Sequence, residues 1–440
     1  LFMDANHSSD IQLNTNIDGS SLNEIHIEAM NSGYVSADLV GDITVTGGIF
    51  VSVDAASHDL NLGSITMDDA SLTLSADHGA TFNNTTDTWL SSVSGNMTDL
   101  TLNADHSSNI SIDIASAITI SGNLSMDANH SSDIQLTANI NGSSLNEIHI
   151  ETANYGNANV DLTGDITLNQ IDIHTSSEAT AHLSLEGQVT LLGNIELYAA
   201  SLSYDAPGDY STTSLDVQSL VGSFDHILLS AENGGKSNFN FVTLDAHIQD
   251  VHLYASGDGN DSGISRIDFN GNINGSTINN LTLEAYGGGA IDSTLLGDLT
   301  LTGNLTLHAD GWSHDTLGTH ESNIQLNANL ANTIQNISAV ACNDASIALE
   351  LHHHFTVDGN IEIASYHQAS IDVHFNDAIT INDGNLSVVA EGISIEQSPP
   401  PLGFETWENT LGTSDVTAIA NVHLQLSDGS TIHNLDVSQA

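Results

Sequence analysis

The stretch Leu124–Thr152 reads LSMDANHSSDIQLTANINGSSLNEIHIET, and it nearly repeats the opening stretch Leu1–Ala29, LFMDANHSSDIQLNTNIDGSSLNEIHIEA. The two copies start 123 residues apart (124 − 1 = 123), and their similarity indicates a recent duplication. Self-similarity at a fixed spacing is typical of repeat architectures, in which each unit buries its apolar face against its neighbours. The duplication therefore predicts an elongated repeat domain.

A shorter repeat of about 24 residues, a period typical of solenoids, lies inside this long one. Its marker is the pattern apolar-x-apolar-x-Ala, and seven of the fifteen intervals between successive markers equal 24 (for example, 124 − 100 = 24). The fifth position is Ala in thirteen of the sixteen markers, among them Ala55, which predicts a crowded inner corner. The markers begin at Leu1, Ile25, Val51, Leu72, Leu100, Leu124, Ile148, Ile171, Ile195, Ile227, Val251, Leu281, Leu305, Ile337, Ile361 and Leu386.

Each unit contains three short stretches in which apolar residues alternate with polar ones. In the unit that begins at Ile148 these stretches are 148–150, 158–162 and 166–168. A period of two with many β-branched residues predicts strands, and stacked units bury the alternate side chains in one core. The sequence therefore predicts an all-β fold, a parallel β-helix (β-solenoid) with three short strands per coil and roughly 17 coils.

Three coils are longer than the rest, and one coil of the ordinary length separates each from the next. They begin at Ile195, Val251 and Leu305, and their lengths are 32, 30 and 32 (227 − 195 = 32; 281 − 251 = 30; 337 − 305 = 32). Loop insertions are therefore expected near residues 204–213, 256–263 and 308–323. Because the long coils alternate with short ones, the loops should project from one region of the rod. Loops held on a rigid scaffold are where binding residues usually lie.

The rest of the chain divides at a cluster of prolines. Continuous coils are expected over 1–394, with a Pro-rich excursion over 395–413, because proline cannot donate to a strand ladder. The last coils are expected over 414–440. Coil-like sequence at both ends predicts open strand edges, which either continue into further chain or pair with another copy.

The charge of the chain excludes several classes of partner. Two basic and 56 acidic residues give a formal net charge of −54. Nucleic acid and anionic membranes would be repelled, whereas divalent cations, calcium first, would relieve the self-repulsion. No apolar stretch approaches the ~20 residues of a membrane helix, so membrane insertion is not expected. The single cysteine, Cys342, excludes a disulfide framework within the chain.

Histidines recur two positions after the Ala column, and three of them fall in consecutive coils: His78, His106 and His130. Stacked at the strand spacing, they could bind a transition metal between coils. The alternative is a polar turn residue copied by duplication. A second cluster, His308, Asp310 and His314 in the third long coil, has the same two interpretations: a metal site or a solvated loop.

Two further patterns suggest roles for oxygen-bearing side chains. The Gly-rich stretch Ser256–Gly263 holds Asp258, Asn260 and Asp261, which could bind calcium or form a plain turn. Asparagine recurs just before the first strand of many coils. Such a column predicts a structural ladder of side-chain hydrogen bonds. Its members include Asn123, Asn194, Asn304, Asn360 and Asn385.

Catalysis is not expected. A β-helical enzyme acting on acidic polysaccharides would need basic residues, and Lys236 and Arg266 are thirty residues apart, which argues against a shared site. The chain shows no nucleophile elbow, phosphate loop or zinc-hydrolase motif. Paired carboxylates on neighbouring strands keep a polysaccharide-active enzyme open as an alternative.

The motifs GNLTLHA (Gly303–Ala309) and ITISGN (Ile118–Asn123), with the duplication, resemble repeat regions of large bacterial surface proteins. These are filamentous-haemagglutinin-like adhesins and autotransporter passenger stalks. The resemblance implies a secreted right-handed β-helix that attaches to cell-surface or matrix glycans or proteins. We therefore expect a non-enzymatic extracellular structural or adhesive segment. The alternative is a filament or S-layer subunit that stacks end to end.

Overall fold

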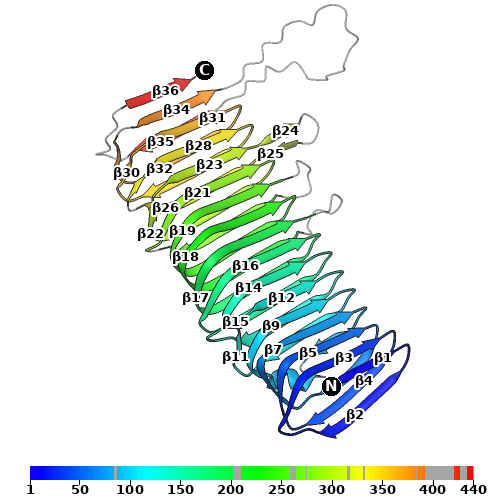
Figure 1. Cartoon of the computed structure of the whole chain (residues 1–440). Coiled ribbons are helices and arrows are strands. Elements are labelled where there is room, and N and C mark those ends of the chain that lie inside the picture. The colour runs from blue at the N-terminus through cyan, green and yellow to red at the C-terminus, as the bar shows by residue number, and fades with distance from the viewer. Residues whose placement is uncertain are drawn as a thin grey trace, which may run out of the picture.

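The computed structural model shows one rod of stacked parallel strands, with the N-terminal and C-terminal coils at opposite ends (Figure 1). Strands make up 76 % of the described residues, and about 15 turns follow one another at a spacing of roughly 24 residues. The predicted parallel β-solenoid is confirmed, and the number of turns is close to the roughly 17 expected. The described residues are 1–83, 87–201, 210–257, 264–273, 275–314, 318–330, 332–382, 384–391, 421–426 and 434–439.

The described secondary structure consists of strands and one 3-10 helix, η1. The first half contains β1 (Phe2–Asn6), β2 (Asp10–Asn16), β3 (Ser20–Met30), β4 (Tyr34–Val40), β5 (Asp42–Asp54), β6 (Ser57–Asn61), β7 (Ser64–Asp77), β8 (Thr81–Asn83), η1 (Thr88–Ser92), β9 (Ser94–Ala104), β10 (Asn109–Ile114), β11 (Ile118–Ile120), β12 (Asn123–Ala128), β13 (Asp133–Asn139), β14 (Ser144–Thr152), β15 (Asn157–Thr163), β16 (Ile166–Ser176) and β17 (Thr180–Ala200). The second half contains β18 (Thr212–Glu232), β19 (Lys236–Ser256), β20 (Arg266–Asn272), β21 (Thr277–Tyr286), β22 (Ala290–Leu301), β23 (Asn304–Asp310), β24 (Trp312–His314), β25 (Gly318–His320), β26 (Asn323–Leu330), β27 (Thr333–Ile334), β28 (Asn336–Cys342), β29 (Ser346–His352), β30 (Phe355–Val357), β31 (Ile361–Tyr366), β32 (Ser370–Phe375), β33 (Ile379–Ile381), β34 (Asn385–Glu391), β35 (Asn421–Leu426) and β36 (Asn434–Gln439).

Strand pairing follows the coil spacing. In the second strand of the coil, Asn109 of β10 lies opposite Asp133 of β13, which lies opposite Asn157 of β15. The third strand of a coil often continues into the first strand of the next, as in β16, where the register shifts between Leu168 and Gln170. Three strand faces therefore enclose one continuous core.

The core is built from the inward residues of the strands, which are almost fully buried along most of the rod and partly buried near its two ends, as at Ile11 and Val422. The column at the end of the first strand holds small residues. Where this column lacks Ala, Thr152, Thr175 and Ser365 are still at most 1 % exposed. Larger side chains would not fit at this corner, because core packing leaves few voids.

One assignment in this column is wrong. Ile25 lies opposite Ile49, not Val51, so Val53 and not Ala55 occupies the column of small residues. A shift of two residues preserves the alternation of inward and outward side chains, so the periodicity alone could not detect it. Ala55 instead has a positive φ of 45° at the following turn.

A further enlarged coil carries η1. Leu72 of β7 lies opposite Leu100 of β9, an offset of 28 in residue number (100 − 72 = 28), because η1 is inserted before β9. Trp89 of η1 is 1 % exposed and packs into the core. This insertion therefore adds a large apolar side chain to the core at this coil.

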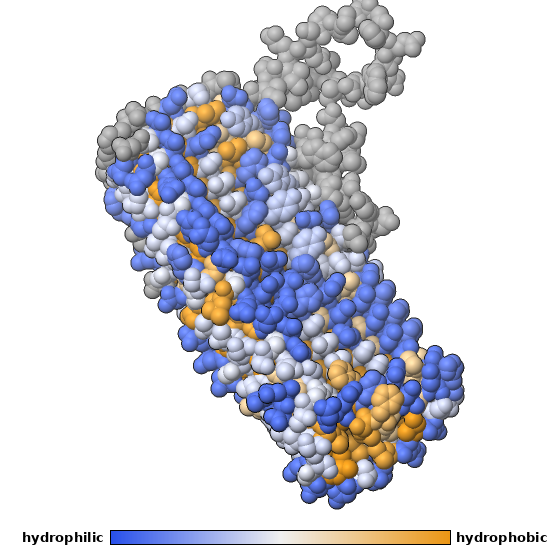
Figure 2. Space-filling view, in the orientation of Figure 1, coloured by the Kyte–Doolittle hydropathy of each residue, from blue (hydrophilic) through white to orange (hydrophobic). Residues whose placement is uncertain are grey.

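Strands resume after the Pro-rich excursion, whose residues 395–413 lie outside the described part of the chain. β35 pairs in parallel with β32, and β36 pairs in parallel with β34. The view in Figure 2 shows a mostly hydrophilic surface along the rod, with apolar side chains gathered at the end that carries the N-terminus. Among the described residues, no helix is long and apolar enough to cross a membrane.

Candidate functional site: the insertion corner

One corner of the rod follows the column of small residues at the end of each first strand, and we name it the insertion corner. Its turn residue has a positive φ in many coils, for example 50° at His78, 49° at His106, 47° at His130 and 49° at Asn154. Asn and His adopt this left-handed backbone more readily than most residues, and β-branched residues avoid it. The histidine column is therefore first of all a turn column.

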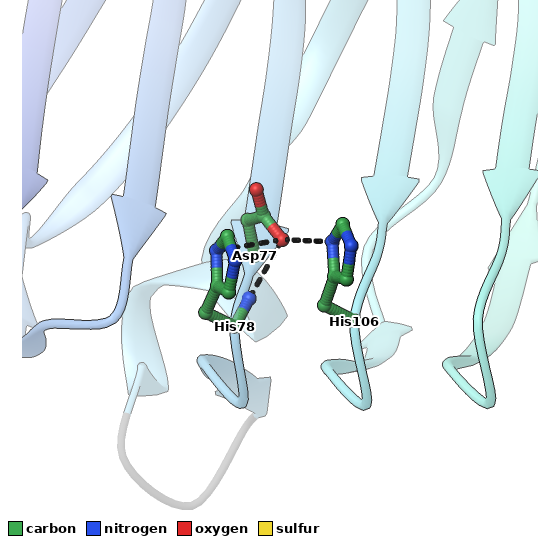
Figure 3. A group of neighbouring side chains, drawn as sticks. All are labelled: Asp77, His78 and His106. Atoms are coloured by element: carbon green, nitrogen blue, oxygen red, sulfur yellow. Dashed lines mark hydrogen bonds and ion pairs between the residues drawn. The ribbon is translucent and has the colours of Figure 1, made fainter.

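The histidines of consecutive coils stack as the sequence predicts. The ring centroids of His78 and His106 lie 4.6 Å apart at an interplanar angle of 1°, and those of His106 and His130 lie 4.7 Å apart at 6°. Each Nδ1 also faces an aspartate of the preceding coil, and Figure 3 shows Asp77 between two rings. The Nδ1–Oδ1 distances are 2.8 Å for His78–Asp54, 2.9 Å for His106–Asp77 and 2.8 Å for His130–Asp105.

We call these six residues the Asp–His ladder. The hydrogen bond to Asp54 raises the pKa of His78 above its usual 6.5. Burial opposes ionisation of Asp105, but hydrogen bonds from His130 and the His106 N–H outweigh it and lower the pKa of Asp105. The hydrogen bonds of the ladder therefore favour the charged form of both Asp105 and His78.

Asparagine makes the same contact in other coils. The Asn31 amide donates to Asn6 Oδ1 at 2.9 Å, and the Asn154 amide donates to Asn129 Oδ1 at 2.8 Å. The ladder contact therefore does not require an imidazole, and hydrogen bonding accounts for the column without a metal ion. Two groups still bring ligand atoms within 4.8 Å of one another. They are Asp77, His78 and His106, and Asp105, His106 and His130.

Two other mixed clusters of His and carboxylates escaped the sequence reasoning. They are Glu147 with His149 and Asp172, and Asp372 with His374 and His423. His149 lies 23 residues before Asp172, and His423 lies 51 residues after Asp372, so these partners meet only through strand pairing. Counting coil lengths from the repeat register would have placed His149 beside Asp172, whereas the Pro-rich excursion hides the register between Asp372 and His423.

The first of these clusters centres on Asp172. Its carboxylate lies 3.2 Å from His149 Nδ1 and 3.1 Å from His174 Nε2. The hydrogen bond to Asp172 raises the pKa of both histidines. Burial alone would raise the pKa of Asp172, but the two histidines outweigh it and hold that pKa far below the usual 3.8.

The three predicted insertions leave from the insertion corner, after the strands that end at Ala200, Ser256 and Asp310 (Figure 1). A fully buried serine re-enters the coil after each of them, and its hydroxyl donates to the carbonyl where the insertion departs. The hydroxyl also accepts a hydrogen bond from a backbone N–H of the preceding coil. We call this arrangement the serine clasp. The donated bonds are Ser211 to Ala200 (2.7 Å), Ser265 to Ser256 (2.7 Å) and Ser322 to Asp310 (2.8 Å), and the accepted bonds come from Glu178 (3.0 Å), Gly234 (2.9 Å) and Gly288 (3.1 Å).

The candidate ligands within the insertions are placed only in part. Asp258, Asn260 and Asp261 lie outside the described residues, so the calcium loop stays a prediction. His308 and Asp310 point outward from β23, and Asp310 accepts a hydrogen bond from the Asn343 amide at 2.8 Å. Following them, β24 and β25 pair in antiparallel fashion, and the side chain of His314 lies outside the described part.

The asparagine column lies at the other end of the first strand. Side-chain oxygens of one coil accept hydrogen bonds from the backbone or side-chain N–H of the neighbouring coil. This pattern holds the outer edge of the coils together. Its bonds include Asn123 N to Asp99 (2.9 Å), His226 N to Asn194 (3.3 Å), Asn336 to Asn304 (2.8 Å), Asn360 N to Asn336 (2.9 Å) and Asn385 N to Asn360 (3.0 Å).

Lys236 and Arg266 lie side by side, which corrects the expectation that their separation keeps them apart. Thirty residues is the length of one long coil, so Lys236 of β19 pairs directly with Arg266 of β20. Both line a depression of about 560 Å³ beside the insertion corner, which we name the cation pocket. Its other lining residues include Tyr210, Ile264, Asp292 and Asn323.

The chain matches no family model, no curated protein and no solved structure. Its geometry alone establishes a β-solenoid repeat protein. The insertion corner, with its ladder in the first half and its clasped insertions and cation pocket in the second, is the part that differs from a plain stack of coils.

Proposed function

We propose that this chain is a non-enzymatic extracellular spacer that presents adhesive loops at fixed intervals. The observation that carries the proposal is the repetition of the serine clasp. Three insertions leave one corner on alternate coils, and each is pinned to the core by a buried hydroxyl. A rod that only had to extend would not need insertions at all, and loops on a rigid scaffold are the usual place for binding.

The spacing role follows from the stack. About 15 turns at ~4.8 Å each give a rod roughly 70 Å long. The core is continuous from Met3 to Leu386. Such a rod holds its insertions at multiples of the strand spacing.

The extracellular location is supported by the net charge of −54 and by the resemblance of the repeats to bacterial surface proteins. Salt and divalent cations outside a cell would screen that charge. Fractionation of the producing cells, with protease added to intact cells, tests this point. Protection of the chain from the protease until lysis would contradict it.

Excision of the insertions tests the adhesive role. Three variants would each replace one insertion by a short turn between the clasped residues, beginning with Ala200 and Ser211. We expect unchanged circular dichroism and melting, together with loss of binding to immobilised matrix glycans and proteins for at least one variant. The control variant shortens the η1 coil before Ser94 but keeps Trp89 and Leu90, which pack into the core, because that insertion leaves from another corner.

Other outcomes of the same experiments separate the alternatives. Undiminished binding by all three variants would contradict the proposal. Release of reducing ends from polysaccharides would favour the enzyme. Uniform fibres seen by electron microscopy in calcium, and lost with a chelator, would favour the filament or layer subunit.

A further inference from the structure

The cation pocket holds both basic side chains of a chain with 56 acidic residues. Lys236 and Arg266 are direct partners across β19 and β20, and their side chains point outward from the same position of consecutive coils. In such an acidic chain, two basic side chains with no binding role would be most stable far apart, each beside its own carboxylates. Their pairing in one depression indicates a site for a negative group.

Arg266 is held in a fixed orientation. Its Nε donates to both carboxylate oxygens of Asp268, at 2.9 and 3.0 Å, and its Nη2 lies 2.9 Å from Asp268 Oδ1 and 3.4 Å from Asp292, which leaves the Nη1 donors. The guanidinium has five N–H donors, so this pairing leaves donors for a further acceptor. The group is 49 % exposed, which keeps that remaining edge accessible.

Lys236 is placed differently. Its Nζ lies 4.2 Å from the ring centroid of Tyr210, and within the described ranges it forms no ion pair with a carboxylate. A lysine that rests on an aromatic ring keeps its charge available to a ligand, because the ring does not neutralise it. Tyr210 comes just before the clasp residue Ser211, so the serine clasp positions it.

The remaining lining is suited to a sugar. Tyr210 offers an aromatic face on which the C–H face of a pyranose can stack, and Ile264 is a 60 % exposed apolar neighbour. Asn323 and Gln325 add amides that can both donate to and accept from hydroxyl groups. A volume of about 560 Å³ lies within the range of small-molecule sites.

We infer that the cation pocket binds a carboxylated sugar of an acidic polysaccharide, with the uronate between Lys236 and Arg266 and its ring on Tyr210. A planar carboxylate matches the fork of a guanidinium. The carboxylates of Asp268 and Asp292 offset the formal charge of the two cations, which favours a monoanion over a phosphate dianion. The inference deepens the proposed adhesive function by naming a ligand class.

Calorimetric titration of the full chain tests this inference. The probe is trigalacturonate, with its methyl ester as the neutral counterpart, at about 0.15 M NaCl, where screening over about 8 Å removes the distant charges. We expect binding of the acid and at least tenfold weaker binding of the ester. Lys236→Gln should weaken binding of the acid by about tenfold or more, because it removes a charge-assisted hydrogen bond.

Gln135→Glu is the matched control, because it makes the same change in net charge on the same strand face, several coils away. It should bind as the unmodified chain does. Tyr210→Ala, which leaves both cations, should also weaken binding, and unchanged melting of each variant shows that the rod is intact. Equal affinity for acid and ester, equal affinity of Lys236→Gln and Gln135→Glu, or equally tight binding of inorganic phosphate would overturn the inference.

The two proposals fail separately. If trigalacturonate does not bind while excision of an insertion still abolishes adhesion, the uronate inference fails and the adhesive spacer stands. If uronate binding depends on Lys236 while the chain adheres to no surface, the adhesive function fails and the pocket stands.

Discussion

At the scale of single residues, backbone conformation restricts which residue types occupy the turn of the insertion corner, and side-chain chemistry acts only within that restriction. The left-handed turn favours His, Asn and Gly, and the His and Asn side chains then meet a hydrogen-bonding partner one coil earlier. His78 with Asp54 and Asn31 with Asn6 are two versions of one contact. A column of histidines can therefore arise without a metal ion, and a test must separate the backbone requirement from the imidazole.

Substitution of His106 makes that separation. His106→Asn keeps a donor and tolerates the positive φ, so the free energy of unfolding should change by less than about 1 kcal/mol, as for an exposed pair. His106→Val should cost about 1–3 kcal/mol, because a β-branched residue is strained in this conformation. Urea denaturation measures both. Equal loss in the two variants, or a Zn²⁺-dependent gain seen only with His106, would show that the imidazole itself is required.

The Asp172 cluster predicts how stability depends on pH. His149 and His174 have raised pKa values in the folded chain. Their contribution to the free energy of unfolding is therefore complete below the usual pKa of 6.5, and it is lost as the pH rises through the raised values. Asp172 has a lowered pKa, so its contribution is present above 3.8 and is lost only in strong acid. The urea concentration at the midpoint of unfolding should therefore be higher at about pH 5.5 than at about pH 8.

Asp172→Asn provides the control for that profile. It removes the charge that raises both histidine pKa values, so the gain in the urea midpoint between the two pH values should shrink. A stability that falls over this interval in the unmodified chain, or an unchanged profile in the variant, would contradict the assigned role.

At the scale of elements, the serine clasp explains how the rod tolerates insertions. The hydroxyls of Ser211, Ser265 and Ser322 tie the exit and re-entry points together, so the strands on either side keep their register. The coil therefore continues as if the insertion were absent, as the pairing of Lys236 with Arg266 across the second one shows.

Removal of one clasp tests this explanation. Ser265→Ala deletes the bond to Ser256 and leaves the buried Gly234 N–H without its acceptor, at a cost of about 1–3 kcal/mol. Faster hydrogen exchange should be confined to the coils around β19 and β20. Ser214→Ala, on the outward face of β18, should change stability by less than about 0.5 kcal/mol. An equally small effect of Ser265→Ala would contradict the clasp.

The sequence predicts most of the elements, because burial enforces period two and the small corner residue marks each turn. It does not determine register where a shift of two preserves the pattern, as at Ile49 and Val51. Outward residues carry no such constraint, so alternation does not reveal their chemistry, although the markers at Ile148 and Ile171 would have placed His149 beside Asp172. The Lys236–Arg266 pair could have been found, since their separation equals the length of the coil between them.

At the scale of the whole molecule, the net charge and the length of the core determine how stability responds to the surroundings. A rod with a net charge of −54 repels itself, and the coils bring those charges within a few ångströms of one another. The fold offsets this repulsion with a core that runs along its whole axis. Its stability should therefore depend on the ions around it, and its shape should not.

Cations should stabilise the rod. The melting temperature should rise with NaCl, because screening shortens the reach of each charge from about 30 Å at 0.01 M to about 10 Å at 0.1 M. Calcium at matched ionic strength should raise it further, since a divalent ion can bridge carboxylates of neighbouring coils. A melting temperature that is independent of both ions, or unchanged by a chelator, would contradict the cation proposal.

The central claim is a single rod whose register runs unbroken through all three insertions, and one distance tests it. Ser125 and Ser338 share one outward column, separated by eight successive pairings through His149, Asp172, Glu196, Leu228, His252, Thr282 and Thr306. Spin labels at both positions, in a Cys342→Ser background, should show a narrow distance distribution near 8 × ~4.8 Å, or about 38 Å. A broad distribution, or a peak displaced by one or more coil spacings of about 4.8 Å, would contradict the unbroken rod.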